Sequence, residues 1–192
     1  MTKVLGLDQS SHCGWAVVWP EMRSPLYGVW HLPLNREDET PAFVTLFDRV
    51  DAVIRDHEIS DVFFERPFEP KWGKGNRRSS DLQKQYVAII MTAAGKHGIS
   101  AEQVPCEYWR ERFTGHRRAA PGLTEEDARK GWWKQQALKS CAKLGWAVSD
   151  HNAAEAIGIA HFGMCCRDRA YDARTAPIFW RAQYSADMGN AA

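Results

Sequence analysis

The sequence KVLGLD at residues 3–8 places a carboxylate at the end of a short apolar run, near the start of a chain of 192 residues. A run of this length that ends at turn-forming residues is typical of a buried strand. An unpaired polar group in such a setting costs about 2–7 kcal/mol, and a charge costs more. A bound cation would compensate the charge of Asp8. Hydrogen bonds from the backbone amides of Ser10 and Ser11 are the alternative.

The segments around this strand indicate an α/β fold. Apolar runs at residues 15–19 and 26–32 predict two further strands, so the chain should open with an antiparallel meander. After them, helices and strands alternate, which favours a partly parallel sheet. These later elements are predicted as a helix over 41–57, a strand at 61–65, a helix from Ser79 or Ser80 to about 96, a strand at 99–104, a short helix at 105–113, and helices over 124–144 and 150–166.

Length and composition predict one compact domain. A chain of 192 residues, 44% of them hydrophobic, can bury a sizeable core and suits a single domain. We expect this domain over residues 1–166 and a weakly ordered tail over 167–192, with a possible packing patch at 178–180. The net charge is only +1, from 25 basic and 24 acidic residues, so any nucleic-acid footprint must be local.

The composition also predicts a soluble, cytoplasmic protein. The first apolar run is too short for a secretory signal, and no stretch approaches the roughly 18 apolar residues of a membrane span. The five cysteines are odd in number and scattered without a CxxC pair, which indicates reduced thiols. Cys165 and Cys166 lie near His161, but adjacent cysteines lack the usual spacing of zinc ligands.

Acidic residues stand at three places where a strand ends or a helix begins. Asp8 ends the first strand, Glu65 ends the strand at 61–65, and the stretch 150–155 opens the last helix. Sites in α/β sheets lie at strand ends, and Mg²⁺ prefers a few carboxylates together with water and substrate phosphate. For Glu65 alone, an ion pair with a nearby arginine is an equally good explanation. Taken together, the three positions predict a metal site.

The last predicted helix offers several candidate ligands. His151 and Asn152 lie one helical turn before Glu155, on its face, whereas Asp150 more naturally caps the helix. Small residues between 153 and 158 would let the helix approach the sheet closely. The alternative is an ordinary capped and packed helix that leaves Glu155 exposed.

These motifs occur in the order of a known family. The sequence LGLD at 5–8 is followed by GWAV at 14–17, by Phe64-Glu65 at the end of a later strand, and by NAAEAIGIA at 152–160. Over about residues 3–164 this set resembles the RuvC family of Holliday-junction resolvases, especially its phage and prophage branch. The resemblance implies a ribonuclease H-like fold with a central mixed five-stranded sheet flanked by helices.

The resemblance also implies a site and a reaction. Asp8, Glu65 and Glu155 would hold two Mg²⁺ or Mn²⁺ ions that hydrolyse a phosphodiester and leave a 5′ phosphate. Lys134 matches a basic residue that would stabilise charge in the transition state. The enzyme would be a structure-selective endodeoxyribonuclease that resolves branched DNA in recombination and repair. The remaining ligand position is open among Asp150, His151 and Asn152.

Two departures from the family support alternatives. The family usually has an aspartate where this chain has Glu155, and a second aspartate or a histidine one turn earlier, where this chain offers His151 and Asn152. These differences motivate a catalytically weak or silent branched-DNA-binding protein. A ribonuclease H-like nuclease acting on flaps or RNA hybrids would use the same carboxylates. A sugar kinase or actin-like ATPase also has an aspartate on its first strand, but needs a second lobe for which this chain has no room.

Two basic segments are candidate DNA contacts. The predicted loop at 66–78 mixes aromatic and basic residues, which suits unstacked bases and phosphates. The resemblance implies that Phe68 wedges into the junction; packing beneath the loop is the alternative. A second basic group extends from Arg110 to Lys143, where a solvated helix face is the alternative. The DNA-binding candidates are Phe68, Lys71, Lys74, Arg77, Arg78, Arg117 and Arg118.

A four-way junction has two symmetric strands to cut, so the resemblance further implies a homodimer. A candidate dimer surface is the helix over 79–96, with Tyr86, Ile89, Ile90 and Met91. The same four residues could equally belong to the core. The sequence does not choose between these readings.

Overall fold

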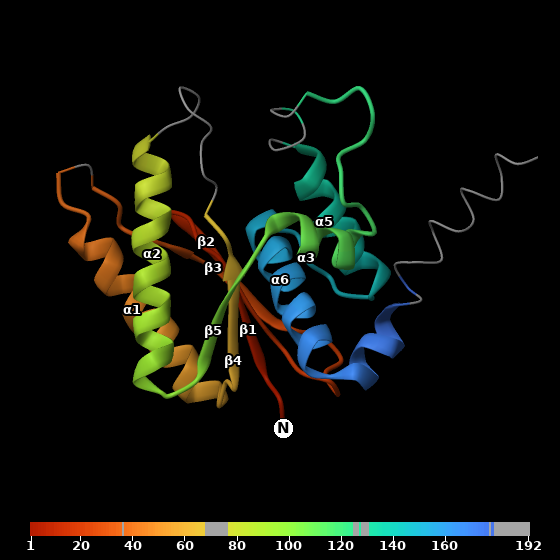
Figure 1. Ribbon diagram of the computed structural model, residues 1–192, viewed down its shortest axis with the longest axis horizontal. Helices are drawn as coiled ribbons and strands as arrows, with labels where there is room; N and C mark the ends of the chain where they lie inside the picture. The colour runs from red at the N-terminus through yellow and green to blue at the C-terminus, as the bar shows by residue number, and fades with distance from the viewer. Residues whose placement is uncertain (36, 68–76, 125–126, 128–130, 177, 179–192) are drawn as a thin grey trace, which may run out of the picture.

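A five-stranded mixed sheet stands between two helical layers in the computed structural model (Figure 1). The strand order is β3-β2-β1-β4-β5, with α1 and α2 on one face and α3, α5 and α6 on the other. The sheet and its flanking helices confirm the predicted α/β architecture. The structure describes residues 1–35, 37–67, 77–124, 127, 131–176 and 178.

The strands pair as the sequence pattern predicts. β1 (Val4–Asp8), β2 (His12–Val18) and β3 (Leu26–His31) form the antiparallel meander. β4 (Asp61–Glu65) then joins β1 in parallel, and β5 (Ser100–Val104) joins β4 in parallel. The carboxyl ends of β1, β4 and β5 therefore meet at one edge of the sheet.

The helices begin and end close to the predicted positions, with two differences. They are α1 (Thr40–His57), α2 (Arg77–Lys96), α3 (Cys106–Thr114), α5 (Trp133–Lys143) and α6 (His151–Arg167). α2 starts two residues before the expected serine. For the helix predicted over 124–144, the structure describes a wider helical turn at 131–132 followed by α5, and residues 125–126 and 128–130 lie outside the described part. None of the helices in the described parts combines the length and the apolar composition that a bilayer crossing requires.

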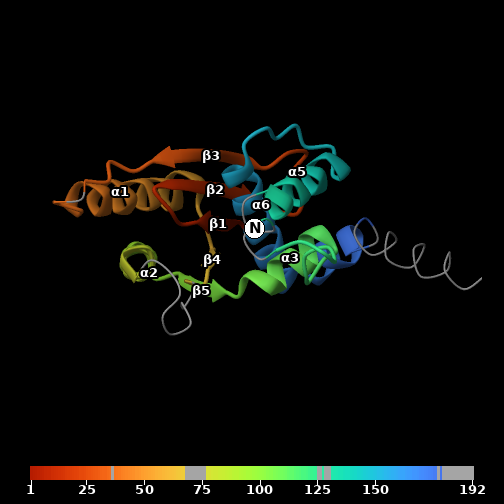
Figure 2. The same cartoon turned by 90° about the horizontal axis from the view of Figure 1, so that it is seen from above.

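The helix α6 lies directly on the sheet because two glycines make room for it. A Cβ atom at Gly6 of β1 would lie 2.4 Å from the carbonyl oxygen of Ala156, and one at Gly14 of β2 would lie 2.1 Å from that of Asn152. On the helix side, the small residues that meet the strands are buried, including Ala160. Figure 2 shows α6 seated against the strands from above. The predicted close approach of this helix is confirmed.

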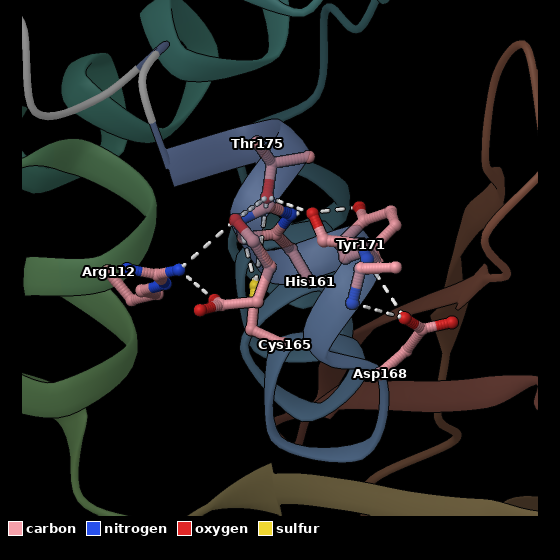
Figure 3. Close-up of polar contacts among 8 residues, drawn as sticks. Arg112, His161, Cys165, Asp168, Tyr171 and Thr175 are labelled. Atoms are coloured by element: carbon pink, nitrogen blue, oxygen red, sulfur yellow. Dashed lines mark hydrogen bonds and ion pairs between the residues drawn. The ribbon is translucent and has the colours of Figure 1, made fainter.

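The chain continues to pack beyond α6. Residues 169–176 are helical, and the ring of Tyr171 is buried in the core. The hydroxyl of Tyr171 lies 2.9 Å from Nδ1 of His161 (Figure 3). Asp172 forms an ion pair with Arg112 of α3. The packed structure thus extends past residue 166, where the sequence pattern placed the end of the domain. Of the patch at 178–180, only Ile178 is among the described residues.

The cysteines are unpaired thiols, as their number and spacing predict. Burial raises the pKa of the Cys141 thiol to about 12 and also raises that of Cys165. Cys165 Sγ lies 3.6 Å from Nε2 of His161, one turn earlier on α6, and 3.9 Å from Oγ1 of Thr175 in the helix at 169–176 (Figure 3).

Candidate active site

Three carboxylates from three separate elements come together at the carboxyl end of the parallel strands. Leu7 of β1 pairs with Phe64 of β4, so Asp8 and Glu65 occupy equivalent positions at the two strand ends. Glu155 approaches them from the first turns of α6, which crosses the same edge. Each of the other two carboxylates raises the pKa of Asp8, which places all three within interaction range. The structure thus brings together the three acids from which the sequence predicts a metal site.

The carboxylates stand in a setting that disfavours their negative charge. Burial, followed by Glu155 and Glu65, raises the pKa of Asp8 well above its usual value. Burial and the charge of Glu65 raise the pKa of Glu155 to about 7. Burial also raises the pKa of Glu65, against the opposing effects of Arg110 and Trp109. The ionised cluster therefore requires positive charge beside it.

Two cations face the carboxylates and lower the pKa of both Asp8 and Glu155. Arg110 of α3 places Nη2 4.0 Å from Oε2 of Glu65. Its guanidinium lies over the rings of Trp109 and Trp133, at 5.2 and 4.9 Å from their centroids. Lys134 of α5 is the second cation, as the sequence predicted.

Sequence reasoning placed Arg110 only in a surface basic group. One signal could have found its inward position: α3 follows directly on β5, and Val104 at the end of β5 pairs with Glu65. The first turns of α3 must therefore lie near that carboxylate.

His151 contacts the cation Lys134. Nζ of Lys134 lies 2.8 Å from Nε2 of His151, so the ammonium donates and the imidazole nitrogen accepts. Burial and the charge of Lys134 lower the pKa of His151, which keeps the ring neutral. His151 thereby restrains Lys134 on the side of the site where α5 meets α6. The backbone carbonyl of Asn152, the other candidate ligand on this turn, packs against Gly14.

Asp150 caps α6. Its Oδ1 accepts hydrogen bonds from the backbone N–H groups of Asn152 and Ala153, at 2.8 and 3.1 Å. Asp150 also lies outside the set of charges that act on Asp8. The structure thus confirms the capping role of Asp150, and metal ligation by its carboxylate stays a prediction.

Asp150→Ala is expected to lower stability without removing metal binding. Loss of an N-cap costs about 1 kcal/mol, which lowers the melting temperature by roughly 2–4 °C for a chain of this size. Thermal denaturation and a Mn²⁺ titration of the same variant check this expectation. A large loss of Mn²⁺ affinity at unchanged stability would instead make Asp150 a ligand.

The donor set suits a hard divalent cation. Carboxylate oxygens are the ligands that Mg²⁺ and Mn²⁺ prefer, and a cation between Asp8, Glu65 and Glu155 would offset the mutual repulsion that raises their pKa values. Within the described ranges, however, no three His, Cys, Asp or Glu side chains already form a ligand set. Oε2 of Glu65 accepts a hydrogen bond from Nε1 of Trp109 at 2.8 Å. The chemistry fits the ion, and the side chains must converge to bind it.

Glu155→Gln is expected to stabilise the metal-free protein at pH 8 and to have a much smaller effect at pH 5. The pKa of Glu155 is about 7 in the folded protein, above its value in the unfolded chain. Between those two values the folded state keeps a proton that the unfolded state releases, so folding stability falls as pH rises through this window. Melting temperatures of the variant and the wild type in EDTA, at both pH values, give the comparison. Equal melting temperatures at pH 8 would contradict the buried, repelled state of Glu155.

Those basic candidates that the structure describes lie at the same end of the sheet as the carboxylates. The amino end of α2 and the loop that follows α3 both border this end (Figure 1). Arg78 pairs with Glu39 at 2.9 Å, Arg117 lies 3.8 Å from Glu111, and Arg118 is exposed. The candidates that lie outside the described residues are Phe68, Lys71, Lys74 and the side chain of Arg77.

Part of the proposed dimer surface belongs to the core. Tyr86 and Ile90 are fully buried between α2 and the sheet, whereas Met91 is 48% exposed and Ile89 is half-buried. The core explanation therefore holds for Tyr86 and Ile90, because their spacing on α2 turns them toward the strands. Only Met91 and part of Ile89 remain available to a partner.

Comparison with known proteins identifies the fold. No family model and no curated protein matches the chain. Among solved structures, Thermus thermophilus RuvC in complex with a Holliday junction substrate is 16% identical, covers 87% of this chain and 96% of its own, and has a TM-score of 0.64. The Thermus thermophilus RuvC structure is 18% identical over 86% and 96% of the two chains, with a TM-score of 0.59. The yeast mitochondrial Holliday junction resolvase Ydc2 is 12% identical over 85% and 77%, with a TM-score of 0.51. The chain therefore has the ribonuclease H-like fold of RuvC, as its sequence predicted.

Proposed function

We propose that the protein is a structure-selective endonuclease that cuts four-way junctions or related branched DNA with Mg²⁺ or Mn²⁺. The observation that carries the proposal is the meeting of Asp8, Glu65 and Glu155 at one sheet edge, with Arg110 and Lys134 beside them. The likeness to a RuvC structure bound to a Holliday junction supports branched DNA as the substrate. Placement in the phage and prophage branch stays a prediction.

The residues of the site divide the chemistry between them. Asp8, Glu65 and Glu155 would hold the divalent ions, which when bound supply activation of a water and stabilisation of the leaving 3′ oxygen. Lys134, restrained by His151, would place positive charge on the phosphoryl oxygens as negative charge develops there. Arg110 offsets the repulsion that three carboxylates would exert on a DNA phosphate.

The basic segments would orient the DNA. The loop after α3 borders the carboxylate end of the sheet (Figure 1), and its Arg117 and Arg118 are exposed to the approach of a polyanion. Arg78, at the opposite side of this end, pairs with an acid that a phosphate can replace. We also propose that two copies act together, because a four-way junction offers two symmetric strands to cut. Analytical ultracentrifugation with and without junction DNA tests the dimer.

A substrate panel tests the function. The protein should cut a synthetic four-way junction with Mg²⁺ or Mn²⁺ faster than a 5′ flap, an RNA/DNA hybrid or a linear duplex of the same sequence, and should stop in EDTA. Equal rates on the linear duplex would refute selectivity for branched DNA. Junction binding without cleavage in either metal would favour the silent DNA-binding alternative, and preferred cleavage of the flap or hybrid would reassign the substrate.

A further inference from the structure

The indole of Trp109 is a neutral donor that points at a carboxylate of the site. Its Nε1–H donates to Oε2 of Glu65 over 2.8 Å, and the side chain of Trp109 is fully buried. The same oxygen faces Arg110, whose Nη2 lies 4.0 Å away. Both groups therefore act on Oε2, so that Oε1 is the oxygen of Glu65 available to a cation.

The ring of Trp109 is itself held in place from two sides. A Cβ atom added to Gly158 of α6 would lie 2.9 Å from Cε3 and Cζ3 of the ring, so only a glycine lets the indole sit against that helix turn. The guanidinium of Arg110 covers the ring at 5.2 Å from its centroid. Gly158 is three residues after Glu155, which puts Trp109 between the turn that carries Glu155 and the strand end that carries Glu65.

We infer that Trp109 is a positioning residue for metal binding: its indole N–H fixes one oxygen of Glu65 and leaves the other to bind the ion facing Asp8 and Glu155. This inference rests on the proposed metal site and adds a residue to it. A carboxylate held at one oxygen binds a cation through a single oxygen, in a fixed direction. Without the donor, the carboxylate can turn to Arg110, which competes with the metal for its charge.

Trp109→Phe tests the inference because it keeps a ring against Gly158 and removes the N–H. Loss of a group that orients a metal ligand typically costs about 10–100-fold in metal affinity, and we expect a loss of this size for Mn²⁺, measured by calorimetry or electron paramagnetic resonance. Junction binding in EDTA should be unchanged. The matched control is Trp146→Phe, which removes a buried indole N–H that donates to the carbonyl of Arg23, with a 3.2 Å separation, and which should bind Mn²⁺ like the wild type.

A double-mutant cycle separates positioning from packing. In a Glu65→Ala background, Trp109→Phe should cause no further loss of Mn²⁺ affinity, because the acceptor is already gone. Unchanged affinity in Trp109→Phe, an equal loss in Trp146→Phe, or a further loss in the Glu65→Ala background would overturn the inference. If the wild type binds no Mn²⁺ at all, the proposed metal site fails and the inference fails with it.

A measurement on the wild-type protein tests the role of Trp109 even if the Trp109 variant does not fold. The chain has nine tryptophans, and we expect one indole N–H resonance to shift when Mg²⁺ is added and to lose this response in Glu65→Gln. Absence of any indole resonance that responds to Mg²⁺ through Glu65 would equally overturn the role of Trp109.

Discussion

Asp8→Asn should abolish cleavage of a four-way junction while leaving junction binding intact. The substitution preserves shape but removes one of three charges that would hold the ions, so the rate should fall by more than the roughly 10–100-fold that loss of an outer-shell partner costs. The basic residues that meet DNA are unchanged. Removal of a negative charge beside them should also slightly favour the phosphate backbone.

Cleavage assays with Mg²⁺ and Mn²⁺, beside gel-shift titrations in EDTA, measure both halves of this expectation. Asp48→Asn is the matched control, since Asp48 is an exposed acid of α1 remote from the site and should behave as the wild type. Full activity of Asp8→Asn would refute the proposed site. Parallel loss of cleavage and binding would point to misfolding or to a direct DNA contact.

Gly6→Val should separate α6 from the sheet and so lose both stability and metal binding. A Cβ atom at position 6 would stand 2.4 Å from backbone atoms of Ala156 and Ala160, which cannot rotate away as a side chain can. Overpacking of this kind costs roughly 3 kcal/mol or more, and the melting temperature should fall by about 10 °C. Because Glu155 is next to the point of contact, Mn²⁺ affinity should fall with it.

The control for this variant is Gly95→Ala. Gly95 lies near the end of α2 and has no atom within 4 Å of an added Cβ, so alanine there should be neutral or stabilising by about 0.5–1 kcal/mol. Thermal melts and Mn²⁺ titrations of the two variants give the comparison. A Gly6→Val protein that melts and binds Mn²⁺ like the wild type would show that α6 does not depend on this contact.

The parts of the site that could be predicted are those set by strand periodicity. Asp8 and Glu65 each end an apolar run, and parallel strands that both end in an acid bring those acids to one edge. The small residues after Asn152 predicted the close approach of α6. On the sheet, Gly6 and Gly14 leave the space that the helix occupies.

The parts that could not be predicted depend on which way a side chain turns on a short helix. Arg110 and Arg112 are two residues apart on α3, and their sequence context marks both as basic surface; the structure turns Arg110 to Glu65 and Arg112 to Asp172. Asp150 was both a cap and a candidate ligand, and its hydrogen bonds with the backbone of α6 show the cap. The packing of Tyr171 likewise depends on a buried partner, His161, that the pattern of the tail does not reveal.

The most direct test of the account is a Mn²⁺ soak of crystals, read by anomalous diffraction. We predict a peak bounded by carboxylate oxygens of Asp8, Glu65 and Glu155, and its loss in Asp8→Asn crystals. A map without a peak at this edge of the sheet, or with Mn²⁺ bound only elsewhere on the protein, would contradict it.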